Sequence, residues 1–122
     1  MPKIVFIAHP FGDDVKGNTK RAAEICKRVH TTEVLPVAPY LESIHYLNDR
    51  DPAERELGMA LDREFFIRKM VDELWLCGPR ISEGMREEIE LSIKYNIPIK
   101  CYNPELKTEL DAILKELNGV SR

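Results

Sequence analysis

The chain has 122 residues, of which 43% are hydrophobic, 32% charged and 7% aromatic, and its net charge is −3. This length suits one domain with a sizeable core, so we expect a single domain over residues 1–122. The absence of a basic cluster argues against a nucleic-acid polymer as partner, and the short apolar runs argue against a membrane span, which leaves a small molecule.

The first half of the chain alternates between strand and helix patterns. An apolar, β-branched run predicts a strand at 3–8 that is buried on both faces, followed by a helix over about 17–30. A second strand is expected at 32–37. The stretch 40–52 is expected to be a loop with room for a short helical turn, and such a long loop in a compact domain points to a functional role.

The second half continues this alternation. Its expected elements are a helix over 53–71, a strand at 73–77, a helix over 84–96, a strand at 97–102, an amphipathic helix over 106–117 and a frayed tail at 118–122. The pattern predicts an α/β fold: a three-layer, Rossmann-like or flavodoxin-like parallel sheet of about four to five strands with helices on both faces.

In strand order 2-1-3-4 a ligand binds outside the carboxyl ends of strands one and three, where the loops 8–18 and 78–84 lie. The second loop runs into a helix near Gly84, whose free N–H groups outline an anion site. Ser82 is either a binding hydroxyl or only the helix N-cap. In the first loop, Gly and Asn residues such as Asn18 suit tight turns, and nucleotide binding is the alternative.

Three carboxylates are candidates for chemistry. Glu88 lies at the margin of the apolar stripe of the 84–96 helix, where it is able to face the cleft. The alternative is a solvated glutamate that only benefits from the helix dipole. Glu64 shares a helical face with apolar residues such as Leu61, which is costly unless it is functional or paired with Arg68. Asp72 closes the same helix and is also suited to capping or a turn.

The 53–71 helix carries two apolar stripes. One contains Leu57, Leu61 and Val71 and is expected to face inward. The other contains Met59, Phe66 and Met70, which suggests either a largely buried helix or an oligomer contact.

Cysteine and histidine spacing argues against a metal site. The three cysteines are odd in number and lack Cys-x-x-Cys spacing, which favours a reduced, cytoplasmic compartment. The three histidines share no metal-binding spacing, and only His9 lies in a nominated loop. We expect no metal and no cofactor.

Several segments resemble the nucleoside 2-deoxyribosyltransferase-like superfamily, and most closely its small uncharacterised bacterial and phage members. The similar segments are 3–10, 18–22, Pro39, 72–78 and 82–88. The resemblance spans about residues 3–102, and Ser-x-Gly-Met-x-x-Glu over 82–88 is its most specific part.

The resemblance implies a chemistry. Characterised relatives break or exchange the N-glycosidic bond of deoxynucleosides or deoxynucleotides through a glutamate nucleophile, and Glu88 falls on that glutamate. In the branch that hydrolyses deoxynucleoside 5′-monophosphates, a serine six residues earlier grips the phosphate, and Ser82 matches it, with Gly84 also in place. The family's aspartate on the preceding helix is expected to fall on Glu64, and Asp72 matches a residue at the start of strand three.

This sequence also departs from its relatives. Phe6 stands where many of them have a tyrosine that positions the catalytic carboxylate. The phosphate loop after strand one is replaced by a segment that carries two acids, Asp13 and Asp14. These acids would repel a phosphate.

The sequence therefore predicts an N-glycosidase or 2-deoxyribosyltransferase acting on (deoxy)nucleosides or their 5′-monophosphates. The alternative is a non-catalytic nucleotide-sensing module of the same fold. Relatives also imply a homo-oligomer, a dimer or larger. The expected catalytic residues are Glu88, Glu64 and Asp72, and the expected ligand contacts are Ala8, His9, Pro10, Asn18, Arg80, Ser82, Gly84 and Met85.

Overall fold

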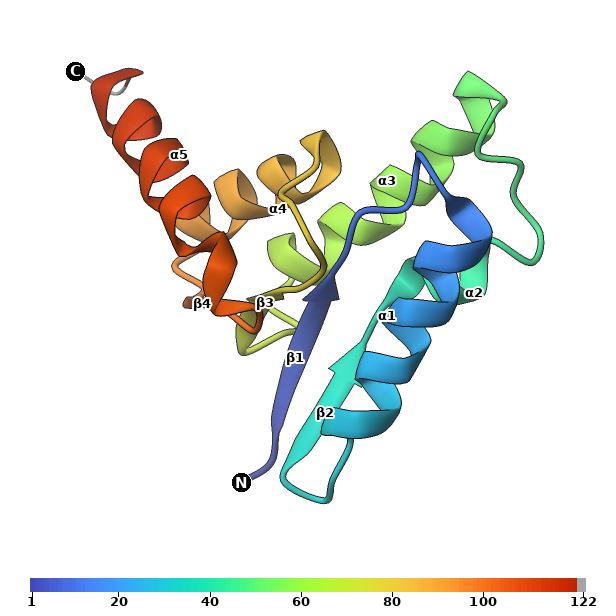
Figure 1. The fold of residues 1–122 in the computed structure, drawn as a ribbon, viewed down its shortest axis with the longest axis horizontal. Coiled ribbons are helices and arrows are strands. Elements are labelled where there is room, and N and C mark those ends of the chain that lie inside the picture. The colour runs from blue at the N-terminus through green and yellow to red at the C-terminus, as the bar shows by residue number, and fades with distance from the viewer. Residues whose placement is uncertain (121–122) are drawn as a thin grey trace.

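The computed structural model describes residues 1–120 and has the predicted α/β architecture (Figure 1). Strands and helices alternate along the chain, with one additional short helix, α2, after the second strand. The elements are β1 (Lys3–Ala8), α1 (Val15–Val29), β2 (Val34–Val37), α2 (Pro39–Ser43), α3 (Pro52–Ile67), β3 (Glu73–Leu76), α4 (Glu83–Lys94), β4 (Ile99–Cys101), a 3-10 turn at Pro104–Leu106, and α5 (Lys107–Val120).

The four strands form one parallel sheet in the order β2-β1-β3-β4, the order on which the expected position of the ligand site depends. β1 lies between two neighbours, with Val5 opposite Pro36 of β2 and opposite Glu73 of β3. Pro36 has no N–H to donate, which suits β2 to its place at the edge of the sheet. The order reverses between β1 and β3, so a crevice is expected outside their carboxyl ends.

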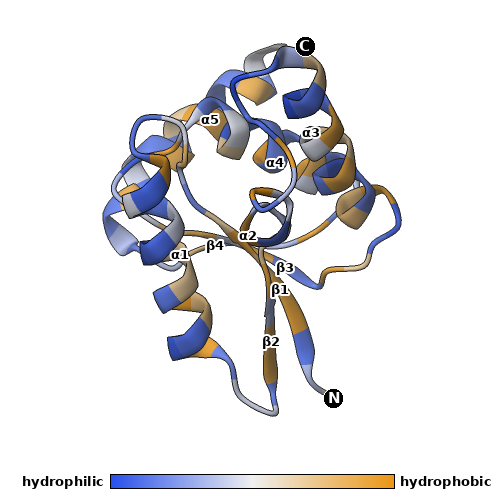
Figure 2. Cartoon of the chain, turned by 90° about the vertical axis from the view of Figure 1, so that its right-hand side faces the viewer, coloured by the Kyte–Doolittle hydropathy of each residue, from blue (hydrophilic) through white to orange (hydrophobic). Residues whose placement is uncertain are grey.

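Alternate residues of β1 serve two different cores, because successive side chains of a strand point to opposite faces. Val5 and Ile7 pack beneath α1. Phe6 and Ala8 belong to a larger core that α3, α4 and α5 cover. Figure 2 shows α1 and α3 on opposite sides of the strands, which gives the three predicted layers.

Helix α3 ends earlier than predicted and turns a different face inward. Its last residue is Ile67, and the chain then turns through Lys69, whose φ of 50° breaks the helix. The expectation that Leu57 and Leu61 face the core is wrong, because they are 60% and 40% exposed. Phe66 is fully buried, and its ring centroid lies 4.9 Å from that of Phe6.

The predicted loop 40–52 is partly helical. Pro39 occupies the first turn of α2, where its missing N–H costs nothing. The chain then bends to Asp51, whose Oδ1 accepts a hydrogen bond from Ala53 N at 3.0 Å and caps α3. At the other end of the chain α5 continues through Val120, so the predicted frayed tail is helical from 118 to 120, and 121–122 lie outside the described residues. No helix within residues 1–120 is long and apolar enough to cross a membrane.

Candidate functional site

A cleft of about 310 Å³ opens at the carboxyl ends of β1 and β3. A ligand site is expected at these carboxyl ends, because the strand order reverses between β1 and β3. The walls of the cleft come from the loops after β1 and β3, from α2 and the segment behind it, from α3 as far as Asp62, and from the start of α4. A smaller cavity of about 50 Å³ shares Asp62 and Gly84 with the cleft and reaches Glu88.

The two predicted loops pack against each other at the base of this edge. Gly78 adopts a φ of +84°, and a Cβ atom there would lie 2.8 Å from Cδ of Pro10. His9 is 4% exposed, with Nδ1 2.7 Å from the Pro10 carbonyl oxygen. Burial lowers the pKa of the His9 imidazole, which therefore remains neutral at pH 7.

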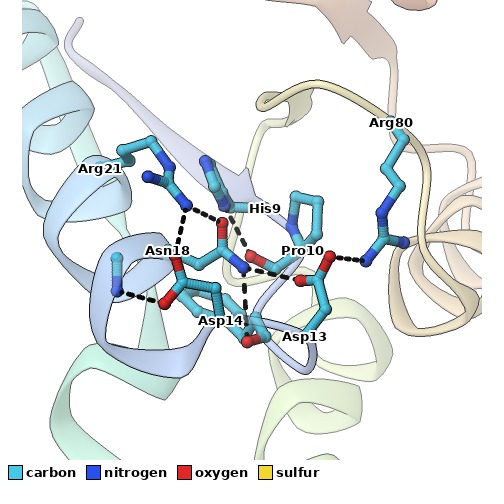
Figure 3. Close-up of polar contacts among 9 residues, drawn as sticks. His9, Pro10, Asp13, Asp14, Asn18, Arg21 and Arg80 are labelled. Atoms are coloured by element: carbon cyan, nitrogen blue, oxygen red, sulfur yellow. Dashed lines mark hydrogen bonds and ion pairs between the residues drawn. The ribbon is translucent and has the colours of Figure 1, made fainter.

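Asn18 holds the first loop together and does not line the cleft (Figure 3). Its side chain is buried, with Nδ2 donating to Phe11 O at 3.4 Å and to Asp13 Oδ1 at 3.0 Å. Its Oδ1 accepts from Arg21 Nη2 at 2.7 Å. Asn18 lies in the first turn of α1, so the expectation of a tight-turn residue is wrong for it. Because both ends of its amide have partners in the chain, Asn18 anchors the loop to the helix.

An ion pair joins the two loops. Arg80 Nη2 lies 3.1 Å from Asp13 Oδ2, and both side chains remain substantially exposed (Figure 3). The hydrogen bond from Arg80 lowers the pKa of the Asp13 carboxyl. Arg80 lines the cleft, but part of its charge is already neutralised by this contact.

The start of α4 is capped from within the chain. Ser82 is the N-cap, and its Oγ accepts a hydrogen bond from Met85 N at 3.3 Å. At Gly84 an added Cβ would have Ser82 Oγ as its nearest neighbour, 4.0 Å away, so the helix start is open toward the cleft. Further along α4, Ser92 Oγ donates to the Glu88 carbonyl at 2.8 Å.

Two carboxylates meet beneath the cleft, Asp62 from α3 and Glu88 from α4, because both line the small cavity. Burial, followed by the nearby charge of Glu87, raises the pKa of Asp62 to about 7. Burial and the charge of Asp62 raise the pKa of Glu88. Two interacting carboxyl groups of this kind hold a proton near neutral pH that isolated carboxylates would have lost.

Arg63 connects α3 to α4 beside this pair. Its Nε lies 2.8 Å from Glu87 Oε1, and its Nη1 lies 2.7 Å from Glu56 Oε1. The guanidinium therefore orients Glu87 and partly offsets its charge. It opposes the rise in the pKa of Asp62 but is outweighed by burial.

The structure places two predicted catalytic residues away from the cleft. Glu64 lies on the outward face of α3, where its side chain is 44% exposed and its Oε1 accepts from Arg68 Nε at 2.9 Å. The interpretation of Glu64 as a functional carboxylate on an apolar face is therefore wrong, and the alternative, an ion pair with Arg68, is confirmed. Asp72 lies at the amino end of β3, where its Oδ2 accepts from Ile4 N at 2.8 Å. It is on the opposite edge of the sheet from Glu88, so it cannot join this site.

The cleft instead contains residues that the sequence analysis missed. Asp62 lies on the same face of α3 as Met59 and Phe66. If that face had been taken as the inward one, Asp62 would have been predicted to lie at the site. Tyr40 comes from the suspected segment 40–52; its ring stacks on Phe11 with centroids 4.0 Å apart. Tyr40 Oη is buried and has no hydrogen-bond partner among the described residues.

The remaining predicted contacts divide into two groups. Pro10 packs against Gly78 and, like Asn18, does not line either space in the described part of the chain. No group of three His, Cys, Asp or Glu side chains within residues 1–120 is placed to hold a metal ion. The predicted residues that do line the cleft or the small cavity are Ala8, His9, Arg80, Ser82, Gly84, Met85 and Glu88.

Comparison with known proteins gives one match. Neither the curated proteins nor the solved structures contain a significant match to the chain. The family model of a domain of unknown function, DUF7768, matches residues 3–102, which include all four strands and α1 to α4. The chain therefore belongs to the DUF7768 family.

Proposed function

We propose that the chain binds a nucleoside or nucleotide in this cleft and breaks or exchanges its N-glycosidic bond through Glu88. The observation that carries the proposal is the carboxylate pair of Asp62 and Glu88 at the base of the cleft. Retaining cleavage of a glycosidic bond requires one carboxylate as nucleophile and a second carboxyl group as proton donor. A volume of about 310 Å³ is at the lower end of the range typical for small-molecule sites.

The pair can divide these roles because it holds a proton near pH 7. With the proton on Asp62, Glu88 is the free carboxylate and attacks the anomeric carbon. The C–N bond breaks, its electron pair stays on the base, and the base takes the proton from Asp62. Water, or a second base, then attacks the same carbon, Glu88 leaves as a carboxylate, and Asp62 recovers a proton.

One experiment separates this proposal from its alternative. The protein is incubated with a panel of deoxynucleosides, nucleosides and their 5′-monophosphates, and free base is measured by chromatography. Release of base supports the enzyme. Saturable binding in calorimetry without any product would instead support the nucleotide-sensing module, and the absence of both would contradict the proposed ligand class.

Tyr40 allows a test of ligand binding that is separate from the chemistry. The Tyr40→Phe variant keeps the stacking on Phe11 and removes only the hydroxyl that lacks a partner. A buried polar group without a partner costs about 1–3 kcal/mol, so we expect unfolding in urea to show unchanged or higher stability. Ligand affinity in calorimetry should fall by about tenfold if the hydroxyl contacts the ligand. Unchanged affinity would show that Tyr40 contributes packing alone.

We further propose that the chain forms a homo-oligomer through the outward face of α3. The Met59, Phe66 and Met70 stripe cannot form this contact as a unit, because Phe66 is fully buried. Leu57 and Leu61 are the exposed apolar residues of this face. We expect light scattering to report a dimer or larger species that Leu57→Glu dissociates, and a monomeric wild-type protein at micromolar concentration would contradict the proposal.

A further inference from the structure

The walls of the cleft carry more negative than positive charge. Its cations are Arg55 and Arg80, while His9, which also lines the cleft, has its pKa lowered by burial and stays neutral. Five acids line the same space, and a sixth, Glu88, lies in the adjoining cavity. The five acids are Asp49, Glu54, Asp62, Glu83 and Glu87. Asp62 carries a proton in the proposed reactive form and Glu87 is paired with Arg63 at 2.8 Å, so the excess of negative charge comes mainly from the other acids.

Arg80 is already paired with a carboxylate, whereas Arg55 forms no ion pair among the described residues and lies among acids. Arg80 contacts Asp13 at 3.1 Å, so a phosphate would have to compete with a carboxylate that is already in place. Arg55 shares the wall of the cleft with Asp49 and Glu54. Glu54 is held there through its Oε1, which accepts from Asn48 N at 3.0 Å.

The helix start that would attract an anion is also compensated. Ser82 Oγ already accepts the Met85 N–H, one of the free donors at the beginning of α4. Glu83 is the first residue of the helix and places a carboxylate at its positive end. A phosphate bound here would therefore meet a local negative charge in addition to the acids of the cleft.

We propose that the cleft selects nucleosides and rejects nucleoside 5′-phosphates. This inference rests on the proposed function and narrows its substrate class. A phosphate monoester carries close to two negative charges at pH 7, whereas a nucleoside is uncharged. A cleft with an excess of acids repels the first by long-range electrostatics and leaves the second unaffected.

The test compares matched pairs, each 2′-deoxynucleoside with its own 5′-monophosphate, by release of free base at low ionic strength. We expect kcat/KM to be at least about tenfold higher for the nucleoside, and we expect this ratio to shrink as salt is raised from about 0.02 to about 0.5 M, because ions screen exposed charges. A monophosphate that reacts as well as its nucleoside, or better, would overturn the inference and leave the proposed function intact.

If neither member releases base, the proposed catalysis fails, and the same pairs are compared by calorimetry. Tighter binding of the nucleoside would then support the inference for a binding module. Equal or tighter binding of the monophosphate, or binding of neither, would overturn it.

Three variants test whether the charges of Asp13 and Glu83 cause the selectivity. Asp13→Asn frees Arg80, and Glu83→Gln removes the carboxylate from the start of α4. Each should reduce the nucleoside-to-monophosphate ratio by roughly two- to threefold, the effect of one charge acting through several ångströms of aqueous surroundings. The matched control is Glu90→Gln on the same helix, where Glu90 lies outside the cleft, 3.9 Å from Arg86, and this variant should leave the ratio unchanged. Equal ratios in all three variants and the wild type would show that these charges do not set the selectivity.

Discussion

Replacing Glu88 by Gln should reduce release of free base by at least about 10⁴-fold, because the amide cannot form the covalent bond to the sugar. Glutamine has nearly the same shape and can occupy the same partly buried position on α4. It also removes a buried carboxylate whose pKa is raised by burial and by the nearby charge of Asp62. The variant should therefore fold at least as well as the wild type, and its thermal unfolding should confirm that.

The assay for Glu88→Gln is single-turnover chromatography on the best substrate of the panel, followed by intact-mass measurement of the protein. The wild type should show a transient mass increase equal to one sugar, and the variant should show none. Glu90→Gln is the matched control, since it makes the same change on the exposed face of α4 and should keep full activity. A folded Glu88→Gln variant that still releases base at more than a few percent of the wild-type rate would contradict the assignment of Glu88 as nucleophile.

The parallel sheet could be predicted because the strands have strong local signals. The run at 3–8 is apolar throughout, as expected of a strand covered on both faces, and the structure buries its residues from Val5 to Ala8. The βα alternation predicted a parallel sheet, whereas the order 2-1-3-4 was assumed and the structure shows it. The cleft at the carboxyl ends of β1 and β3 was predictable once that order is assumed, as were His9 and Ser82 in its lining and Glu88 in the adjoining cavity.

The second carboxylate could not be located from periodicity alone. Helix α3 carries apolar residues on two sides, so its sequence is compatible with either side facing the core. The two orientations differ in which acid points inward. The stripe with Leu57 and Leu61 has as many apolar residues as the correct one, and it led to Glu64 instead of Asp62. Only the packing of Phe66 against Phe6 decides between them, and that contact spans 60 positions of the chain.

Asp72 illustrates a different kind of error. Its position immediately before β3 already places it at the amino edge of a parallel sheet, opposite the edge at which ligands bind. The segment 40–52 contributes Tyr40, Leu47 and Asp49 to the walls of the cleft, and its functional role stays a prediction. Which of its residues would line the cleft depended on the short helix α2, whose five residues leave too weak a periodic signal.

Replacing Asp62 by Asn should have opposite effects on activity and on stability. The pKa of Asp62 is about 7 in the folded chain, against 3.8 for the unperturbed group. Between these two values the unfolded chain releases a proton that the folded chain retains, so the wild-type free energy of unfolding falls as the pH rises from about 4 to 7. The difference of about 3 pKa units sets an upper limit of about 4 kcal/mol on this loss, and partial exposure to solvent reduces it to about 2 kcal/mol.

The neutral amide of the Asp62→Asn variant does not carry that penalty. The variant should match the wild type near pH 4, exceed its stability by about 2 kcal/mol at pH 7.5, and release base about 10²- to 10³-fold more slowly, because the proton donor is missing. Urea unfolding at pH 4.5, 6 and 7.5 measures the first effect. Glu64→Gln is the matched control on the same helix, and it should change stability by less than about 0.5 kcal/mol at every pH, since Glu64 is an exposed ion-paired residue. A variant that is less stable than the wild type at pH 7.5 would mean that Asp62 supports the fold. A variant that is more stable and less active would mean that the chain tolerates a destabilising carboxylate because the reaction uses its proton.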